Sequence, residues 1–206
     1  MIKIWGRANS INVQKVLWSC DELGMTFERI DAGMQFGVTS TPAFLAINPN
    51  GLVPVLEHDG FTLWESHAIV RYLARGNGLG GLCPADPKQA ARADQWMDWA
   101  STTLWPPMKP VFMNLVRVAP PERDHAAIAQ GLLGLTAAFR ILDAHLAHHN
   151  YVAGDDFTMG DIPLAVIAYR WFELEIERTD FSHLKRWYEQ VTSRPGFKRH
   201  CAVKLT

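Results

Sequence analysis

Cysteine is scarce in this chain. Only Cys20, Cys83 and Cys201 occur in 206 residues, and no Cys-x-x-Cys pair is present. The spacing therefore predicts neither a zinc ribbon nor a dithiol redox site, and it favours a reducing compartment without structural disulfides.

The chain also lacks an excess of charge of either sign. Twenty Lys and Arg residues against 21 Asp and Glu residues give a formal net charge of −1, so neither nucleic acid nor an anionic membrane surface is an expected partner. No uninterrupted apolar run approaches the roughly 20 residues of a membrane helix, and Gly6 and Arg7 come too early for a secretory signal. With 48% hydrophobic and 20% charged residues, we expect a globular cytoplasmic protein.

The first 76 residues alternate strand-like and helix-like segments. Ile2–Trp5 reads as a strand, and apolar residues recur at helical spacing between positions 13 and 23. Phe27–Asp31 reads as a second strand, with Phe27 and Ile30 as its buried members. Strand, helix and strand within about 30 residues predict a βαβ unit.

A second set of segments completes this part. A short helix is expected at Phe44–Ile47, and strands at Val53–Glu57 and Phe61–Trp64 are joined by a link so short that they must be antiparallel. A helix follows over Glu65–Arg75. The order is that of a thioredoxin-like α/β domain, which we place at residues 1–76.

Residues 77–87 are rich in glycine and proline and read as a linker. Strand patterns then vanish, so residues 88–206 are expected to form an all-helical domain. Pro106, Pro107 and Pro110 should bend or break its first helix. Helices are expected over residues 88–104, 124–149, 158–172 and 184–193, the last of these ending at Arg194-Pro-Gly196.

Ser10 and Asn12 lie between the first strand and the first helix. A helix N-terminus carries unpaired N–H groups and a positive dipole end, which bind anions and stabilise thiolates. A hydroxyl and an amide at this position could donate hydrogen bonds to an anionic sulfur or oxygen. The alternative is that Ser10 or Asn9 only caps the helix.

Two further segments could bind an extended peptide. A cis Val53–Pro54 bond would turn the N–H and C=O of Val53 outward, where an extended peptide could pair with them as an added strand. The alternative is an ordinary trans proline after the turn, which would not expose these groups. Glu65 could pair with an ammonium group and the N–H of Ser66 could bind a carboxylate, as a zwitterionic amino-acid head requires. The alternative is a plain helix start with an acid beside it.

The aromatic and methionine residues near the prolines form a candidate pocket. Trp105, Met108, Phe112 and Met113 flank a proline-bent helix, and they could either line an apolar pocket or pack in the core. Cys20 falls on the apolar stripe of its helix and is expected to be buried.

Two other motifs favour a structural interpretation. Thr158 and Asp161 match a capping box, with Phe157 packing on Ile162, which starts a buried helix and performs no chemistry. His145, His148 and His149 have helical spacing that a metal could use, but no acidic or thiol ligand accompanies them, so a solvated helix end is favoured.

Taken together, these segments resemble cytosolic glutathione S-transferases. The resemblance covers the whole chain, and Gly6–Val16 is most similar to bacterial theta-like members. It implies a glutathione-binding domain at 1–76 and a helical domain at 88–206 that lines the electrophile site. The matching segments, in order, are Ser10 with Asn12, Asn48–Pro54, Leu63–Leu73 and Phe157–Asp161.

The resemblance also implies residue roles for glutathione as the cosubstrate. Val53, before a cis Pro54, would pair its backbone with the cysteinyl unit, and Glu65 and Ser66 would hold the γ-glutamyl end. Ser10 would donate a hydrogen bond to the thiolate, with Asn12 as a second donor. Thr39 and Gln35 are candidates for the glycine end, and Trp105, Met108 and Phe112 for the electrophile.

The resemblance has informative departures. Trp5-Gly6 stands where mammalian-type classes have tyrosine, and no cysteine occupies the first turn of the first helix. These absences favour stabilisation of a thiolate over thiol exchange. A glutathione thiol with an ordinary pKa of about 8.5 would be ionised by hydrogen bonds to its charged form.

The expected activity is attack of the glutathione thiolate on a small apolar electrophile, a detoxification reaction, in a homodimer that needs no metal. One alternative is a glutathione-dependent disulfide reductase or peroxidase that uses bound glutathione without a protein cysteine. A further alternative is a non-catalytic binding module with this fold.

Overall fold

A computed structural model describes all of residues 1–206 and contains one four-stranded sheet. The sheet order is β2-β1-β3-β4, with β1 parallel to β2 and the other pairs antiparallel. The expected βαβ unit and the antiparallel pair after it are both confirmed. The strands are β1 (Ile2–Trp5), β2 (Phe27–Ile30), β3 (Val55–His58) and β4 (Phe61–Trp64).

The expectation that Phe27 and Ile30 are buried was wrong, because both are only half-buried. Their strand, β2, lies at one edge of the sheet and pairs only with β1. An edge strand has a neighbour on one side only, so apolar residues in it keep part of their surface. The alternating pattern located the strand but not its place in the sheet.

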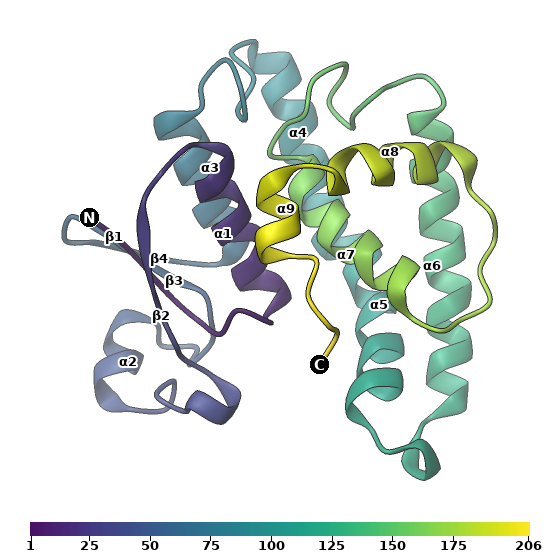
Figure 1. The fold of residues 1–206 in the computed structure, drawn as a ribbon, viewed down its shortest axis with the longest axis horizontal. Coiled ribbons are helices and arrows are strands. Elements are labelled where there is room, and N and C mark those ends of the chain that lie inside the picture. Colours follow the sequence, from purple (N-terminus) through teal and green to yellow (C-terminus); the bar gives the residue numbers. More distant parts are fainter.

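Helices cover both faces of the sheet (Figure 1). α1 (Ile11–Glu22) and α3 (Ser66–Asn77) lie on one face, and α2 (Pro42–Ile47) lies on the other, after the short 3-10 helix η1 (Met34–Phe36). On the α2 side Phe44 packs with Ala32 and Val55 in a small separate core.

Gly6 fixes how the chain passes from β1 into α1. Its φ of +151° is outside the range that side chains favour, and a Cβ there would lie 2.3 Å from Val13 Cγ2 and 3.2 Å from Val53 Cβ. Only glycine therefore lets the start of α1 approach Val53 this closely.

The second half of the chain is helical, as expected. α3 ends at Asn77 and α4 begins at Pro87. The elements are α4 (Pro87–Trp99), η2 (Ala100–Leu104), α5 (Trp105–Phe112), η3 (Met113–Arg117), η4 (Pro120–Glu122), α6 (His125–Leu146), α7 (Asp161–Glu173), α8 (Ser182–Thr192) and α9 (Pro195–His200).

The three prolines do not break the first helix of this domain. The chain stays helical from Pro87 to Arg117, because two π-helical segments, η2 and η3, flank α5. Pro106 and Pro107 stand in the first turn of α5 and Pro110 lies inside it, so three N–H groups are missing from this helical stretch. A π-helical segment bonds each N–H to a carbonyl five residues earlier instead of four, so the hydrogen-bond pattern can shift beside the prolines without ending the helix.

α6 is long and apolar enough to span a membrane by length and composition. In the structure it packs against α5 and α8, with Leu135, Phe139 and Leu142 fully buried. The core helix of a soluble protein can have the same length and composition, so these two properties of α6 are weak evidence for a membrane span.

Two expected helix boundaries were wrong at the C-terminal end. α7 begins at Asp161, with Gly160 rather than Thr158 as its N-cap. The predicted reciprocal bond is present, since the Asp161 carboxylate accepts from the N–H of Thr158 at 2.9 Å, but the Thr158 hydroxyl accepts from the N–H of Gly160 and not from that of Asp161. α8 is not the last helix. α9 follows it at once, with Pro195 at its first position, where proline starts a helix as readily as it ends one.

α1 joins the two domains. It contacts α3 on one side and α7 and α9 on the other, and its middle residues are all buried. Trp18 packs against Phe157 and Phe197, and the hydrophobic core runs without interruption from β1 to α9. The start of α1 is therefore fixed from both domains at once.

Candidate active site

Two cavities adjoin at the start of α1. The first, which we call the α5 cavity, has a volume of about 360 Å³ and lies between the β1–α1 turn and α5. The second, the α3 cavity, has a volume of about 500 Å³ and lies at the N-terminus of α3. Asn12 and Trp105 line both. Both domains therefore contribute walls to a continuous site.

Ser10 is the N-cap residue of α1, yet its side chain makes no capping hydrogen bond. Its backbone carbonyl accepts from the N–H of Gln14, and the residue is 6% exposed and lines the α5 cavity. No acidic residue stands in the first turn of α1. The hydroxyl is thus available to a ligand at the positive end of the helix dipole.

Asn12 is held by a buried lysine. Lys15 Nζ lies 3.0 Å from Asn12 Oδ1 and 3.0 Å from His67 Nε2. Because the amide oxygen accepts from Lys15, the amide NH₂ of Asn12 remains free to donate. Burial, with a smaller effect of Arg170, lowers the pKa of Lys15 to about 7, and Glu65 opposes this shift.

Burial, together with the charges of Lys15 and Arg71, lowers the pKa of His67 to about 2. The imidazole is therefore neutral at physiological pH and can accept a hydrogen bond from the ammonium group of Lys15. Lys15 and His67 both line the α3 cavity.

Val53 borders the α5 cavity and precedes a cis peptide bond to Pro54. The N–H and C=O groups of Val53 take part in no backbone hydrogen bond of the chain. An unpaired N–H and C=O beside a cavity can bind an extended peptide in the manner of an added strand.

Glu65 and Ser66 lie together in the α3 cavity. Glu65 has a φ of +72°, a left-handed conformation that residues other than glycine rarely adopt. Ser66 is 5% exposed and is the first residue of α3, where backbone N–H groups lack helical partners. A carboxylate side chain beside free N–H groups can bind a ligand whose ammonium and carboxylate groups are close together, as in an amino-acid head group.

The helical domain supplies the outer wall. Trp105, Phe112 and Met113 line the α5 cavity, whereas Met108 is fully buried and lines neither cavity. Gln35 and Thr39 also lie outside both cavities, although their neighbour Met34 borders the α5 cavity.

The cysteines and the histidine cluster lie outside the site. All three cysteines are buried, and burial raises the pKa of the Cys20 thiol to about 12. No group of metal-ligating side chains forms in the structure. His145 is bonded to the backbone oxygen of Val152 at 2.9 Å and stacks on His149.

Two sets of residues at the site could not be predicted from local patterns in the sequence. Lys15 and His67 lie within two segments that carry the family resemblance, Gly6–Val16 and Leu63–Leu73, but no local pattern assigns a role to either side chain. The second set, which we call the cation cluster, lines the α5 cavity, and local sequence patterns could not predict it because its members come from three segments that are distant in the chain. It consists of Arg7, Lys109, Arg117 and Arg170.

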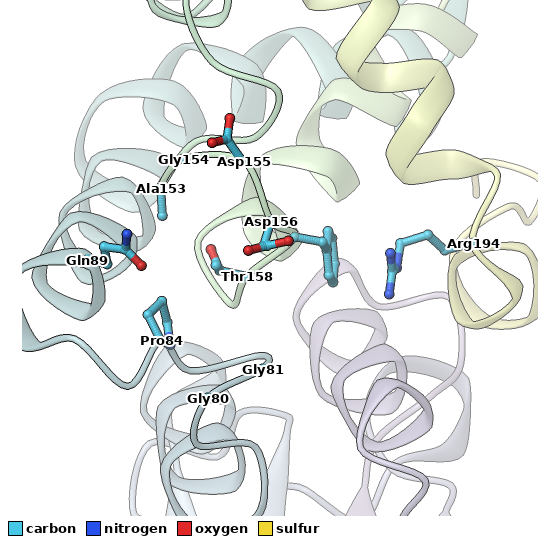
Figure 2. A pocket seen from close by; sticks show the side chains of 11 residues that line it. Gly80, Gly81, Pro84, Gln89, Ala153, Gly154, Asp155, Asp156, Thr158 and Arg194 are labelled. Atoms are coloured by element: carbon cyan, nitrogen blue, oxygen red, sulfur yellow. The ribbon is translucent and has the colours of Figure 1, made fainter.

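A separate hollow lies at the domain junction, between the segment after α3 and the loop before α7 (Figure 2). Its volume is about 450 Å³, and none of the predicted site residues lines it. Arg194, at its edge, pairs with Glu22 and lies over the ring of Phe157 at 4.1 Å. These charges are satisfied within the fold, so we assign the hollow no role.

Comparison with known proteins agrees with the geometry. Residues 1–75 match the glutathione S-transferase N-terminal domain, and residues 96–195 match the glutathione S-transferase C-terminal domain. The chain is 45% identical to glutathione S-transferase GstB of Escherichia coli over 208 residues, with 100% of both chains covered. It is 32% identical to glutathione S-transferase 3 of Zea mays, covering 98% of this chain and 94% of that one.

The solved structures include a similar one with ligand. The theta class glutathione S-transferase of Xanthomonas axonopodis pv. citri, with glutathione bound, is 44% identical, with a TM-score of 0.96 over 100% of this chain and 99% of that one. The chain belongs to the glutathione S-transferase family and is an enzyme of that family. Its domains are the thioredoxin-like and helical domains that the sequence indicated.

Proposed function

We propose that the protein binds glutathione across the two cavities and ionises its thiol for attack on an electrophile. In this proposal Glu65 and Ser66 hold the γ-glutamyl end in the α3 cavity, and Val53 pairs with the cysteinyl backbone beside Pro54. Thr39 and Gln35 remain candidates for the glycine end, which would require the η1 segment to approach the ligand. The glutathione-bound Xanthomonas relative supports this choice of ligand.

The observation that carries the proposal is the Ser10 side chain, which faces the α5 cavity without capping α1. Its hydroxyl and the Asn12 amide would donate to the thiolate, and the helix dipole adds a favourable potential. Hydrogen bonds to the charged form lower a thiol pKa, and each pKa unit corresponds to about 1.36 kcal/mol.

The electrophile would lie in the α5 cavity with its apolar part against Trp105 and Phe112. The sulfur would form a bond to an electrophilic carbon, and the leaving group would depart with the bonding electron pair. The absence of a cysteine from the described cavity walls supports conjugation over a mixed disulfide with the protein.

Three measurements test this function. Calorimetry should show glutathione binding, and ultraviolet absorbance of the bound thiolate should give a thiol pKa below about 8.5. Turnover of an aryl halide, against a disulfide and a peroxide, separates conjugation from the redox alternative. No binding, or a thiol that stays protonated when bound, would contradict the proposal.

We also propose that the protein is a homodimer. The rings of Phe61 and Tyr72 lie 5.3 Å apart at a tilt of 43° and border, with Leu63, an open apolar hollow on β4 and α3. Phe61 is 47% exposed and Tyr72 36% exposed. An apolar patch of this kind on a soluble domain is typical of a contact surface.

A further inference from the structure

The α5 cavity has an unusual charge. Four cationic side chains line it, and no aspartate or glutamate does. The whole chain carries a formal charge of −1, so this concentration of positive charge is local. The four come from the β1–α1 turn, α5, η3 and α7, and only the tertiary structure brings them together.

None of the four forms an ion pair within the chain. Other arginines do, since Arg29, Arg71 and Arg194 each pair with a carboxylate. In contrast, the buried Nε atoms of Arg7, Arg117 and Arg170 have no hydrogen-bond partner. Buried charges are normally paired, and an unpaired one costs free energy.

Arg170 is the best defined of the cluster. It is 3% exposed, donates to the backbone oxygen of Val166 at 2.7 Å, and lies over the ring of Phe112 at 5.2 Å. Arg117 lies over the same ring at 5.9 Å. Two guanidinium groups thus lie against one aromatic ring at the wall of the cavity.

Burial lowers the pKa of Arg170 to about 10, and burial together with the charge of Arg117 lowers the pKa of Arg7. With a pKa of about 10, Arg170 remains charged at neutral pH, and no acid of the cavity wall offsets the positive charge of the cluster. A bound anion would offset it.

We propose that the α5 cavity selects electrophiles that carry a carboxylate or sulfonate group, which the cation cluster binds while Trp105 and Phe112 contact the apolar part. The proposal rests on the proposed function for the reacting thiolate. It replaces the expected apolar electrophile with an anionic one, because a purely apolar ligand would leave these cations unpaired. Guanidinium groups suit such anions through paired hydrogen bonds.

The test compares two alkylating agents of nearly equal size, iodoacetate and iodoacetamide. In both, the thiolate sulfur bonds to the methylene carbon and iodide leaves with the electron pair, so they differ in charge and not in chemistry. We expect the ratio of kcat/KM for iodoacetate over iodoacetamide to fall about tenfold in Arg117→Gln and in Lys109→Gln. The matched controls Arg92→Gln and Lys88→Gln lie outside both cavities and should keep the wild-type ratio.

An unchanged ratio in both cavity variants would overturn the proposal. The proposal would also be overturned if the cavity variants raised the KM for glutathione equally with either alkylating agent, because the cluster would then bind the glycine carboxylate of glutathione. Iodoacetamide turnover close to that of wild type shows that a variant is folded and active.

A binding measurement separates this proposal from the proposed function. Calorimetry with naphthalene-1-sulfonate and naphthalene-1-sulfonamide, without glutathione, should show a preference for the sulfonate that Arg117→Gln reduces. If that preference is present but neither alkylating agent reacts, the cation site stands and the conjugation reaction does not. Equal binding of the two naphthalenes would overturn the cation site even if conjugation is observed.

Discussion

The ammonium nitrogen of Lys15 lies 3.0 Å from Asn12 Oδ1 and 3.0 Å from His67 Nε2, so one buried cation joins α1 to α3. This link orients the Asn12 amide at the point where the two cavities meet. It also places a titratable group with a pKa of about 7 beside the proposed site.

Replacing Lys15 by Met should change how stability depends on pH. Because the pKa of Lys15 is about 7 in the folded chain and about 10.4 when unfolded, the unfolded chain binds more protons between these values, and the free energy of unfolding rises with pH. Lys15→Met removes that rise. Its stability relative to wild type should therefore be most favourable near pH 7 and should decline towards pH 9, measured by urea unfolding.

The exposed Lys88→Met is the control and should differ from wild type by the same amount at both pH values. If the free energy of unfolding of Lys15→Met also differs from that of wild type by the same amount at both pH values, the pKa of Lys15 is not lowered in the folded protein.

Ser10→Ala should raise the thiol pKa of bound glutathione by about one unit, because one hydrogen bond to the charged sulfur is lost. Turnover near pH 6.5 should then fall about tenfold, with a smaller loss at a pH above both thiol pKa values. Thiolate absorbance and a pH–rate profile measure these effects, and Ser182→Ala, on the exposed start of α8, serves as control. If Asn12→Ala has this effect and Ser10→Ala does not, Asn12 is the principal donor.

Glu65→Gln should weaken glutathione binding by about tenfold, because an ionised partner for the ammonium group is replaced by a neutral amide. Calorimetric affinity is the measurement. The exposed Glu177→Gln is the control for loss of one negative charge. Unchanged affinity in Glu65→Gln would favour a role for this residue in the turn before α3 only.

Asp161→Ala should destabilise the protein by about 3 kcal/mol or more, because several buried donors lose their acceptor. The Asp161 carboxylate accepts from Trp187 Nε1 at 2.8 Å, from the N–H of Thr158 at 2.9 Å and from the N–H of Val152 at 3.1 Å. Urea unfolding measures the loss. Asp155→Ala, exposed in the same loop, should change stability by less than about 0.5 kcal/mol, and an equal loss in both would contradict the assignment.

Tyr72→Glu should shift the sedimentation of the protein from dimer towards monomer, because a charge on the patch formed by Phe61, Leu63 and Tyr72 would have to be desolvated in the contact. Analytical ultracentrifugation across a range of concentrations measures this. Leu133→Glu, which places the same charge at an exposed position of α6, should leave the assembly unchanged. Wild-type protein that sediments as a monomer would contradict the homodimer.

Local patterns in the sequence determined most of the elements and part of the site. Alternating and helical periodicity located all four strands and the main helices, since these patterns depend on neighbours a few residues apart. Ser10, Asn12, Glu65 and Ser66 could be proposed from their positions at helix starts, where the backbone itself provides the chemistry.

Only the tertiary structure decided the rest, because it depends on residues that are distant in the chain. The edge position of β2, the fully buried Met108 and the contact of Lys15 with His67 follow from packing between elements. So does the cation cluster, whose members span positions 7 to 170. Periodicity shows which face of an element is buried, but not which partner covers it or which charges meet across a cavity.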